Sequence, residues 1–219
     1  MKTMLNISLN WPWLSIKLQQ NMQVLSWAVH RPGFVMTDQI LWREVRNSDL
    51  SVDVDVAEWL GAEVAGIGAS NAVVMLTSRN VRTYQTAEVT VDEISAVAIA
   101  TVGLSNLERV GSRLTPDEQK QMWGTINVAV ITNQPLSQIG LLEASSIITE
   151  ARTTAVIEAG VKLPTGIATG TGTDCVAIAA PVGEENYTGL HTPQGEAIGR
   201  AAYQAVSACV QDWITNCPI

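Results

Sequence analysis

The second half of the sequence alternates apolar strands with two long helices, an order that few folds accommodate. Residues 124–132 are rich in β-forming side chains, and residues 174–180 have the continuous apolar character of a buried strand. One helix is predicted over 138–159, where Gly160 supplies a stop, and a second begins at Thr192 and Pro193 and reaches about residue 215. This order predicts a sheet that is covered by the two helices.

The first hundred or so residues are predicted mostly as strands. Apolar and polar residues alternate over 5–9 and 14–18, and a Trp11-Pro12-Trp13 turn separates the two runs. A helix is predicted within 52–64, where Asp55 and Glu58 form a capping box. Further strands are predicted at 23–29, 40–45, 73–77, 86–91 and 94–102, and a short helix after Thr115. The expected fold class is therefore α+β, with a mixed, largely antiparallel sheet, the two long helices packed on it, and one layered domain spanning residues 1–219.

Charge and cysteine content exclude several classes of protein. The formal net charge is −8 and the 13 Lys and Arg residues are scattered, which argues against a nucleic-acid partner. No apolar run approaches the roughly 18 residues that span a bilayer, and residues 1–10 lack the apolar core of a signal peptide. The three cysteines do not make a disulfide framework. We therefore expect a cytoplasmic protein with reduced thiols and no membrane partner.

The common catalytic motifs are absent from the sequence. The two histidines, His30 and His191, do not have zinc-hydrolase spacing, and neither a G-x-S-x-G elbow nor a Walker motif occurs. The most unusual local feature is the loop Ala-Thr-Gly-Thr-Gly-Thr-Asp at 168–174. Its glycines would let backbone N–H groups approach an anion or a polarised oxygen. A tight connection whose glycines merely accept positive φ explains the loop about equally well.

Two further positions could take part in acid–base chemistry. Glu150 shares one helical stripe with Glu143, Thr154 and Glu158. It would be a general acid or base facing a cleft, but periodicity alone favours a solvated outer face. His30 would shuttle protons or ligate a metal in a ligand, although a turn residue with satisfied hydrogen bonds is the commoner role at such a position.

Four stretches of the sequence resemble the adenosylcobinamide amidohydrolase family of corrinoid salvage. They are TVGLSN at 101–106, GTINV at 124–128 followed by PLS at 135–137, TEARTTA at 149–155, and ATGTGTD at 168–174. Their order and spacing also agree, and weaker matches at 25–26, 42–45 and 75–78 extend the resemblance over most of the chain. One position departs from the family pattern, because Arg152 stands where a lysine is expected.

The resemblance implies hydrolysis of the amide that joins 1-amino-2-propanol to a propionyl side chain of the corrin ring. The products would be adenosylcobyric acid and free aminopropanol. The implied partner is a small-molecule corrinoid, and no separate cofactor is expected because the cobalt belongs to the substrate; homo-oligomer formation is left open. A non-catalytic corrinoid-binding or carrier protein and an amidohydrolase that acts on a different amide are the alternatives.

The predicted site combines the residue chemistry with this resemblance. Glu150 or Asp174 would activate water, and Asn127 would help the 168–174 loop to hold the developing oxyanion. Arg152 cannot act as a base as a lysine can, but it can hold an oxyanion or a corrin amide. The predicted substrate-binding residues are Gly170, Thr171, Gly172, Thr173, Arg152, Ser105, Asn106, Thr77 and His30.

Overall fold

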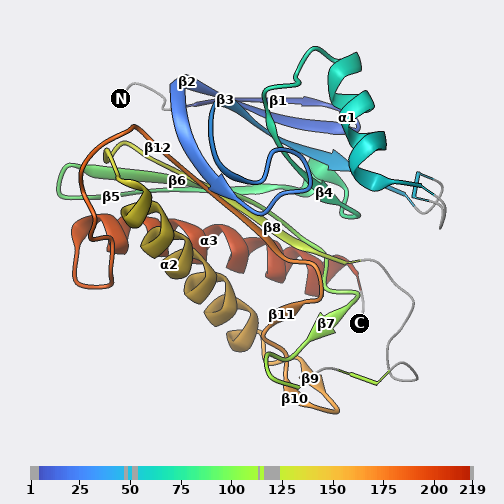
Figure 1. The fold of residues 1–219 in the computed structure, drawn as a ribbon. Helices are drawn as coiled ribbons and strands as arrows, with labels where there is room; N and C mark the ends of the chain where they lie inside the picture. The colour runs from blue at the N-terminus through green and yellow to red at the C-terminus, as the bar shows by residue number, and fades with distance from the viewer. Residues whose placement is uncertain (1–4, 47–48, 51–53, 113, 116–123, 218–219) are drawn as a thin grey trace.

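The computed structural model describes residues 5–46, 49–50, 54–112, 114–115 and 124–217 of the 219-residue chain. Its centre is an eight-stranded mixed sheet (Figure 1). The spatial order is β4 (Val73–Thr77), β3 (Gly33–Glu44), β2 (Trp13–Ser26), β12 (Cys175–Ala180), β8 (Ile126–Thr132), β6 (Ile94–Val102) and β5 (Gln85–Val91), and β1 (Leu5–Asn10) pairs with β2. Two pairs, β3–β4 and β8–β12, are parallel and the other five are antiparallel. The predicted mixed, largely antiparallel sheet is confirmed.

Two long helices, α2 (Gln138–Glu158) and α3 (Pro193–Asn216), cover one face of the sheet, as predicted (Figure 1). Ser137 and Thr192 cap them, because each hydroxyl accepts the backbone N–H three residues further on, at 3.1 and 3.0 Å. Gly160 follows α2 with a φ of 70°, the left-handed conformation that ends many helices. The core between helices and sheet includes alternate residues of the central strands: Val128, Val130, Val176 and Ile178.

The other face of the central strands is covered by the N-terminal strands. Ala129 and Ala177 belong to a second core that also contains Ile16, Ile40 and Met75 from β2, β3 and β4. In Figure 1, β1 to β4 accordingly lie above β12, β8 and β6, and α2 and α3 lie below them. Helix α1 (Val56–Gly66) packs on the outer side of the N-terminal strands, and Asp55 caps it as predicted.

Some element bounds differ from those predicted. Strand β2 is continuous where two strands were expected, because a bulge between Lys17 and Met22 accommodates an exposed polar stretch without ending the pairing. Strand β3 begins at Gly33, seven residues earlier than predicted, since Gly33 has a φ of 86° that turns the chain into the strand. The short helix predicted after Thr115 falls on 116–123, outside the described residues.

Smaller elements complete the described chain. They are the helical turn η1 (Val81–Thr83) and two short antiparallel pairs, β7 (Leu107–Glu108) with β11 (Gly170–Thr171) and β9 (Lys162–Leu163) with β10 (Gly166–Ile167). The 168–174 loop therefore contains a two-residue strand, β11. Within the described ranges, neither α2 nor α3 nor α1 is long and apolar enough to cross a membrane.

Candidate active site

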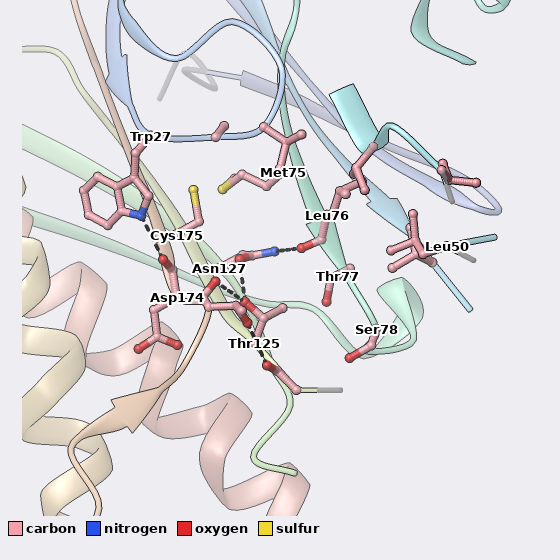
Figure 2. A pocket seen from close by; sticks show the side chains of 17 residues that line it. Trp27, Leu50, Met75, Leu76, Thr77, Ser78, Thr125, Asn127, Asp174 and Cys175 are labelled. Atoms are coloured by element: carbon pink, nitrogen blue, oxygen red, sulfur yellow. Dashed lines mark hydrogen bonds between the residues drawn. The ribbon is translucent and has the colours of Figure 1, made fainter. Parts of the chain in front are cut away.

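A pocket of about 610 Å³ lies at one end of the sheet, where β8 and β12 begin and β4 ends (Figure 2). It opens on the sheet face opposite α2 and α3, because Met75 and Cys175 in its wall belong to the second core. Its described polar lining is Thr77, Ser78, Thr125, Asn127, Thr173, Asp174 and Cys175. Its apolar lining is Trp27, Ala28, Val29, Val45, Leu50, Val54, Val56, Met75 and Leu76. A polar floor with an apolar wall is the usual form of a small-molecule site.

The polar floor is built from two parallel strands in register. Asn127 on β8 pairs with Cys175 on β12, so both side chains point to the same face. The Asn127 amide nitrogen donates to the Leu76 carbonyl at 2.6 Å, and its oxygen lies 3.1 Å from the Thr125 hydroxyl. That hydroxyl is also 2.8 Å from the Thr173 carbonyl. Figure 2 shows these hydrogen bonds across the polar floor. The buried Asn127 side chain is thereby held in one orientation.

Asp174 turns its carboxylate away from this floor (Figure 2). The carboxylate pairs with Arg152 and accepts the Thr171 hydroxyl, the Thr171 N–H at 3.0 Å and the Ile126 N–H at 3.1 Å. These four donors match the number that two carboxylate oxygens can accept. Its backbone carbonyl accepts the Trp27 indole N–H at 2.8 Å. Asp174 therefore joins β8, α2, the 168–174 loop and the residue that follows β2.

Burial dominates the electrostatics of both titratable groups in the described pocket lining. Burial raises the pKa of Asp174 above its ordinary value of 3.8, although Arg152 and the hydrogen bonds from Thr171 and Ile126 act in the opposite direction. Burial also raises the pKa of the Cys175 thiol, to about 11. Cys175 is therefore a protonated thiol at neutral pH. Among the described residues, no three His, Cys, Asp or Glu side chains are grouped so that they could hold a metal ion.

Close packing fixes the 168–174 loop against its surroundings. A Cβ at Gly170 would lie 2.5 Å from Oδ2 of Asp174, so a side chain there would displace the carboxylate that Arg152 holds. A Cβ at Gly124 would lie 2.7 Å from the Gly103 carbonyl oxygen and 2.8 Å from Oδ1 of Asn106. Gly124 and Gly170 require glycine because backbone or polar atoms approach them closely.

The stretch at 101–106 lies behind the floor. The Gly103 N–H donates to the Thr125 carbonyl at 2.9 Å, and the Gly172 N–H lies 3.4 Å from the Asn106 carbonyl. Oδ1 of Asn106 is buried, and none of the residues that the structure describes forms a hydrogen bond with it. Ser105 and Asn106 are half-buried and lie outside the described pocket lining. They support the Gly124–Thr125 backbone rather than forming the pocket surface.

The structure brings some of the predicted residues together and separates others. Thr77, Asn127, Thr173 and Asp174 line the pocket, whereas Arg152, Gly170, Thr171 and Gly172 lie behind Asp174 or beside Asn106. Glu150 is exposed on α2, accepts the Ser146 hydroxyl at 3.2 Å, and is outside the described lining. Its position is the solvated outer face that periodicity favours.

His30 is also outside the described lining, at the position of a satisfied turn residue. Its backbone pairs with Val74, and Nε2 lies 3.2 Å from the Ser70 carbonyl.

Thr125, Cys175 and Trp27 are among the pocket residues that sequence reasoning missed. Thr125 lies inside the GTINV stretch, two residues before Asn127, and strand alternation places both on one face. Cys175 follows Asp174 directly and pairs with Asn127 across β8 and β12. Its place beside Asn127 can be recognised only when the pairing of these two strands is known. Trp27 follows the Leu25-Ser26 match, but nothing local distinguishes it from the other six tryptophans.

Comparison with known proteins finds a relative of this chain and solved structures that are similar to it. A curated relative is the uncharacterized protein MJ1613 of Methanocaldococcus jannaschii, 31% identical over 164 residues that cover 64% of this chain and 63% of that protein. The crystal structure of the PH0078 protein from Pyrococcus horikoshii is 11% identical, with a TM-score of 0.48 over 90% of this chain and 76% of that one. An L-aminopeptidase D-Ala-esterase/amidase from Ochrobactrum anthropi, described as a variant of the Ntn-hydrolase fold, is 11% identical, with a TM-score of 0.45 over 94% and 82%.

The family model of adenosylcobinamide amidohydrolase matches residues 2–218, which is nearly the whole chain. The match confirms the resemblance that the four stretches indicate. The chain belongs to the adenosylcobinamide amidohydrolase family.

Proposed function

We propose that the pocket hydrolyses the aminopropanol amide of adenosylcobinamide, releasing adenosylcobyric acid and 1-amino-2-propanol. In this reaction the oxygen of a water molecule bonds to the acyl carbon and the C–N bond breaks. One water hydrogen stays with the new carboxyl group and the other goes to the departing amine. The cobalt is carried by the substrate and takes no part in the bond changes.

The position of the four family-like stretches, two lining the pocket and two directly behind it, supports this proposal. Thr125 and Asn127 come from the second stretch, and Thr173 and Asp174 from the fourth. Arg152, from the third, holds Asp174 from behind, while the first stretch supports the Gly124–Thr125 backbone. Four separate stretches of the sequence thus meet at one end of the sheet, as expected of a family's shared site.

Asn127 is the best-placed electrophilic group for this reaction. Its amide nitrogen carries two hydrogens and one of them goes to the Leu76 carbonyl. The second can donate to the substrate carbonyl oxygen, and the hydrogen bond to Thr125 keeps the amide from rotating. A donor that is already oriented in a largely apolar pocket stabilises a developing oxyanion without reorganisation.

Asp174 is assigned a positioning role in this proposal, in place of the water-activating role that the sequence suggested. Its carboxylate oxygens are occupied by Arg152, Thr171 and Ile126, and they point away from Asn127 (Figure 2). The consequence is a fixed Thr171–Asp174 turn, which sets the Thr173 carbonyl against the Thr125 hydroxyl.

Product analysis tests the reaction. The purified chain is incubated with adenosylcobinamide, and both products are followed by mass spectrometry. Equimolar release of aminopropanol and adenosylcobyric acid, in proportion to enzyme, is the expected result. Binding of the corrinoid without release would instead identify a carrier. Release of amines from other amides but not from this one would assign a different substrate.

A further inference from the structure

Trp27 differs from a core tryptophan in both its exposure and its anchoring. Its side chain follows β2, is 50% exposed, and forms part of the described pocket wall. The indole N–H donates to the Asp174 carbonyl at 2.8 Å, so the ring is fixed by its polar edge (Figure 2). A half-exposed indole that is held in one orientation presents a rigid apolar surface at little cost in side-chain entropy.

Further apolar residues line the pocket, including Leu50 on the side opposite Trp27 (Figure 2). Val29 is 42% exposed, and Leu50, Val54 and Val56 also belong to the wall of the pocket. The polar floor at Asn127 and Thr125 lies on the other side of Cys175 (Figure 2). The pocket thus divides into an apolar wall that suits a flat ring and a polar floor that suits an amide.

We propose that Trp27 is a specificity-determining residue whose indole stacks against the flat corrin ring while the aminopropanol amide reaches the Asn127 floor. This inference rests on the proposed function and adds the orientation in which the substrate binds. A corrin is a large, amide-fringed cation, and the face of an indole attracts both flat apolar surfaces and positive charge. The hydrogen bond from Trp27 to Asp174 places that face and the 168–174 turn in a fixed relation.

Trp11 provides a matched control. It is 51% exposed, nearly the same as Trp27, but it stacks with Arg46 at 5.1 Å and lies outside the described pocket lining. The variants are Trp27→Ala, Trp27→Phe and Trp11→Ala. Binding of cobinamide is measured by equilibrium dialysis, tryptophan fluorescence quenching is recorded in the same samples, and KM and kcat are determined with adenosylcobinamide. Circular dichroism melts confirm that each variant is folded.

We expect Trp27→Ala to weaken cobinamide binding about tenfold and to raise KM with little change in kcat, since it removes a contact made equally before and during the reaction. Trp27→Phe keeps an aromatic face and should recover most of the affinity, but it loses the quenching contributed by Trp27. Trp11→Ala should bind as the wild type does. Equal binding by Trp27→Ala and the wild type, or equal losses in Trp27→Ala and Trp11→Ala, would overturn the inference.

Failure of the reaction and failure of this inference give different results. If the wild type binds cobinamide but releases no aminopropanol, the proposed reaction is wrong and the role of Trp27 in binding is still decided by the variants. If the wild type hydrolyses the substrate and Trp27→Ala has an unchanged KM, the stacking role is wrong and the reaction stands. A wild type that neither binds nor hydrolyses overturns both.

Discussion

Arg152 on α2 and Asp174 before β12 form an ion pair whose side chains are only 12% and 7% exposed. The pair connects the helical layer to the turn that lines the pocket, and the Asp174 carboxylate also accepts hydrogen bonds from Thr171 and Ile126. A guanidinium group is well suited to this position because it stays charged and has several donors in a fixed plane. Arg152, which stands where the family's lysine is expected, thus forms an ion pair with Asp174.

Removing one partner of the Arg152–Asp174 ion pair should destabilise the folded protein. Arg152→Met leaves a buried carboxylate without its cation, and we expect the free energy of unfolding to fall by about 3 kcal/mol. Arg152→Lys keeps the charge and should lose less. The double variant Arg152→Met with Asp174→Asn should lose less than the sum of the two single variants, because the partners are coupled. Urea unfolding of the wild type, Arg152→Met, Asp174→Asn and the double variant measures this coupling, and additive losses would contradict it.

The pair between Arg200 and Glu196 serves as the control for this experiment. The two side chains are 51% and 46% exposed, and the two residues lie one turn apart on α3. Exposed pairs of this kind contribute at most about 1 kcal/mol. Arg200→Met should therefore change the unfolding free energy far less than Arg152→Met.

Asp174 should give the stability a specific pH dependence. Burial raises its pKa in the folded protein above 3.8, so folding favours the protonated form. The stability that this group contributes is fully present below pH 3.8 and is lost as the pH rises through its folded pKa. The unfolding free energy of the wild type minus that of Asp174→Asn should therefore decrease over this window. Arg152→Met should extend the decrease to higher pH, and a difference that grows with pH would contradict the account.

The Cys175 thiol should report on occupancy of the pocket. Because its pKa is about 11, alkylation by iodoacetamide should be slow at pH 7 and should accelerate about tenfold per pH unit up to about pH 11. Cobinamide should slow the reaction, since Cys175 lines the pocket. A Cys217→Ser background removes the most exposed of the three thiols, and peptide mapping separates Cys175 from the buried Cys209. Labelling that cobinamide leaves unchanged would place the ligand elsewhere.

Asn127 should affect turnover more than binding. Removing one oxyanion donor typically lowers kcat by about 100- to 1,000-fold, and we expect Asn127→Ala to lower kcat by about 100-fold with a smaller change in KM. Asn133→Ala is the matched control, because Asn133 follows the other end of β8 and bonds to Ser95 and Glu93. Steady-state kinetics of aminopropanol release makes the comparison. Similar kinetic losses in both variants would refute a specific role for Asn127.

Local sequence signals predicted the elements, because caps and turns act over a few residues. Asp55 and Thr192 cap helices, and Gly160 ends one, as residues of these types do when they precede or follow an apolar periodic run. The bulge that keeps β2 continuous was not predicted, since it depends on pairing with β3 and not on β2 alone.

The arrangement of the site depended on contacts between distant residues. Arg152 and Asp174 are 22 positions apart, and their pairing requires α2 to lie against the start of β12. Whether Glu150 or Arg152 faces inward is decided by that packing, because the two lie on different sides of the same helix turn. Recognition of the four stretches located Asn127 and Asp174, but only the fold showed that one points to the pocket and the other away from it (Figure 2).

Hydrolysis in water labelled with oxygen-18 tests the central proposal most directly. If the pocket cleaves the aminopropanol amide with water, each turnover places one labelled oxygen in the new carboxyl group of adenosylcobyric acid, and the released aminopropanol stays unlabelled. Mass spectrometry of both products measures this. No cleavage by a folded protein that binds the substrate, or cleavage that leaves the acid unlabelled, would contradict the proposed amide hydrolysis.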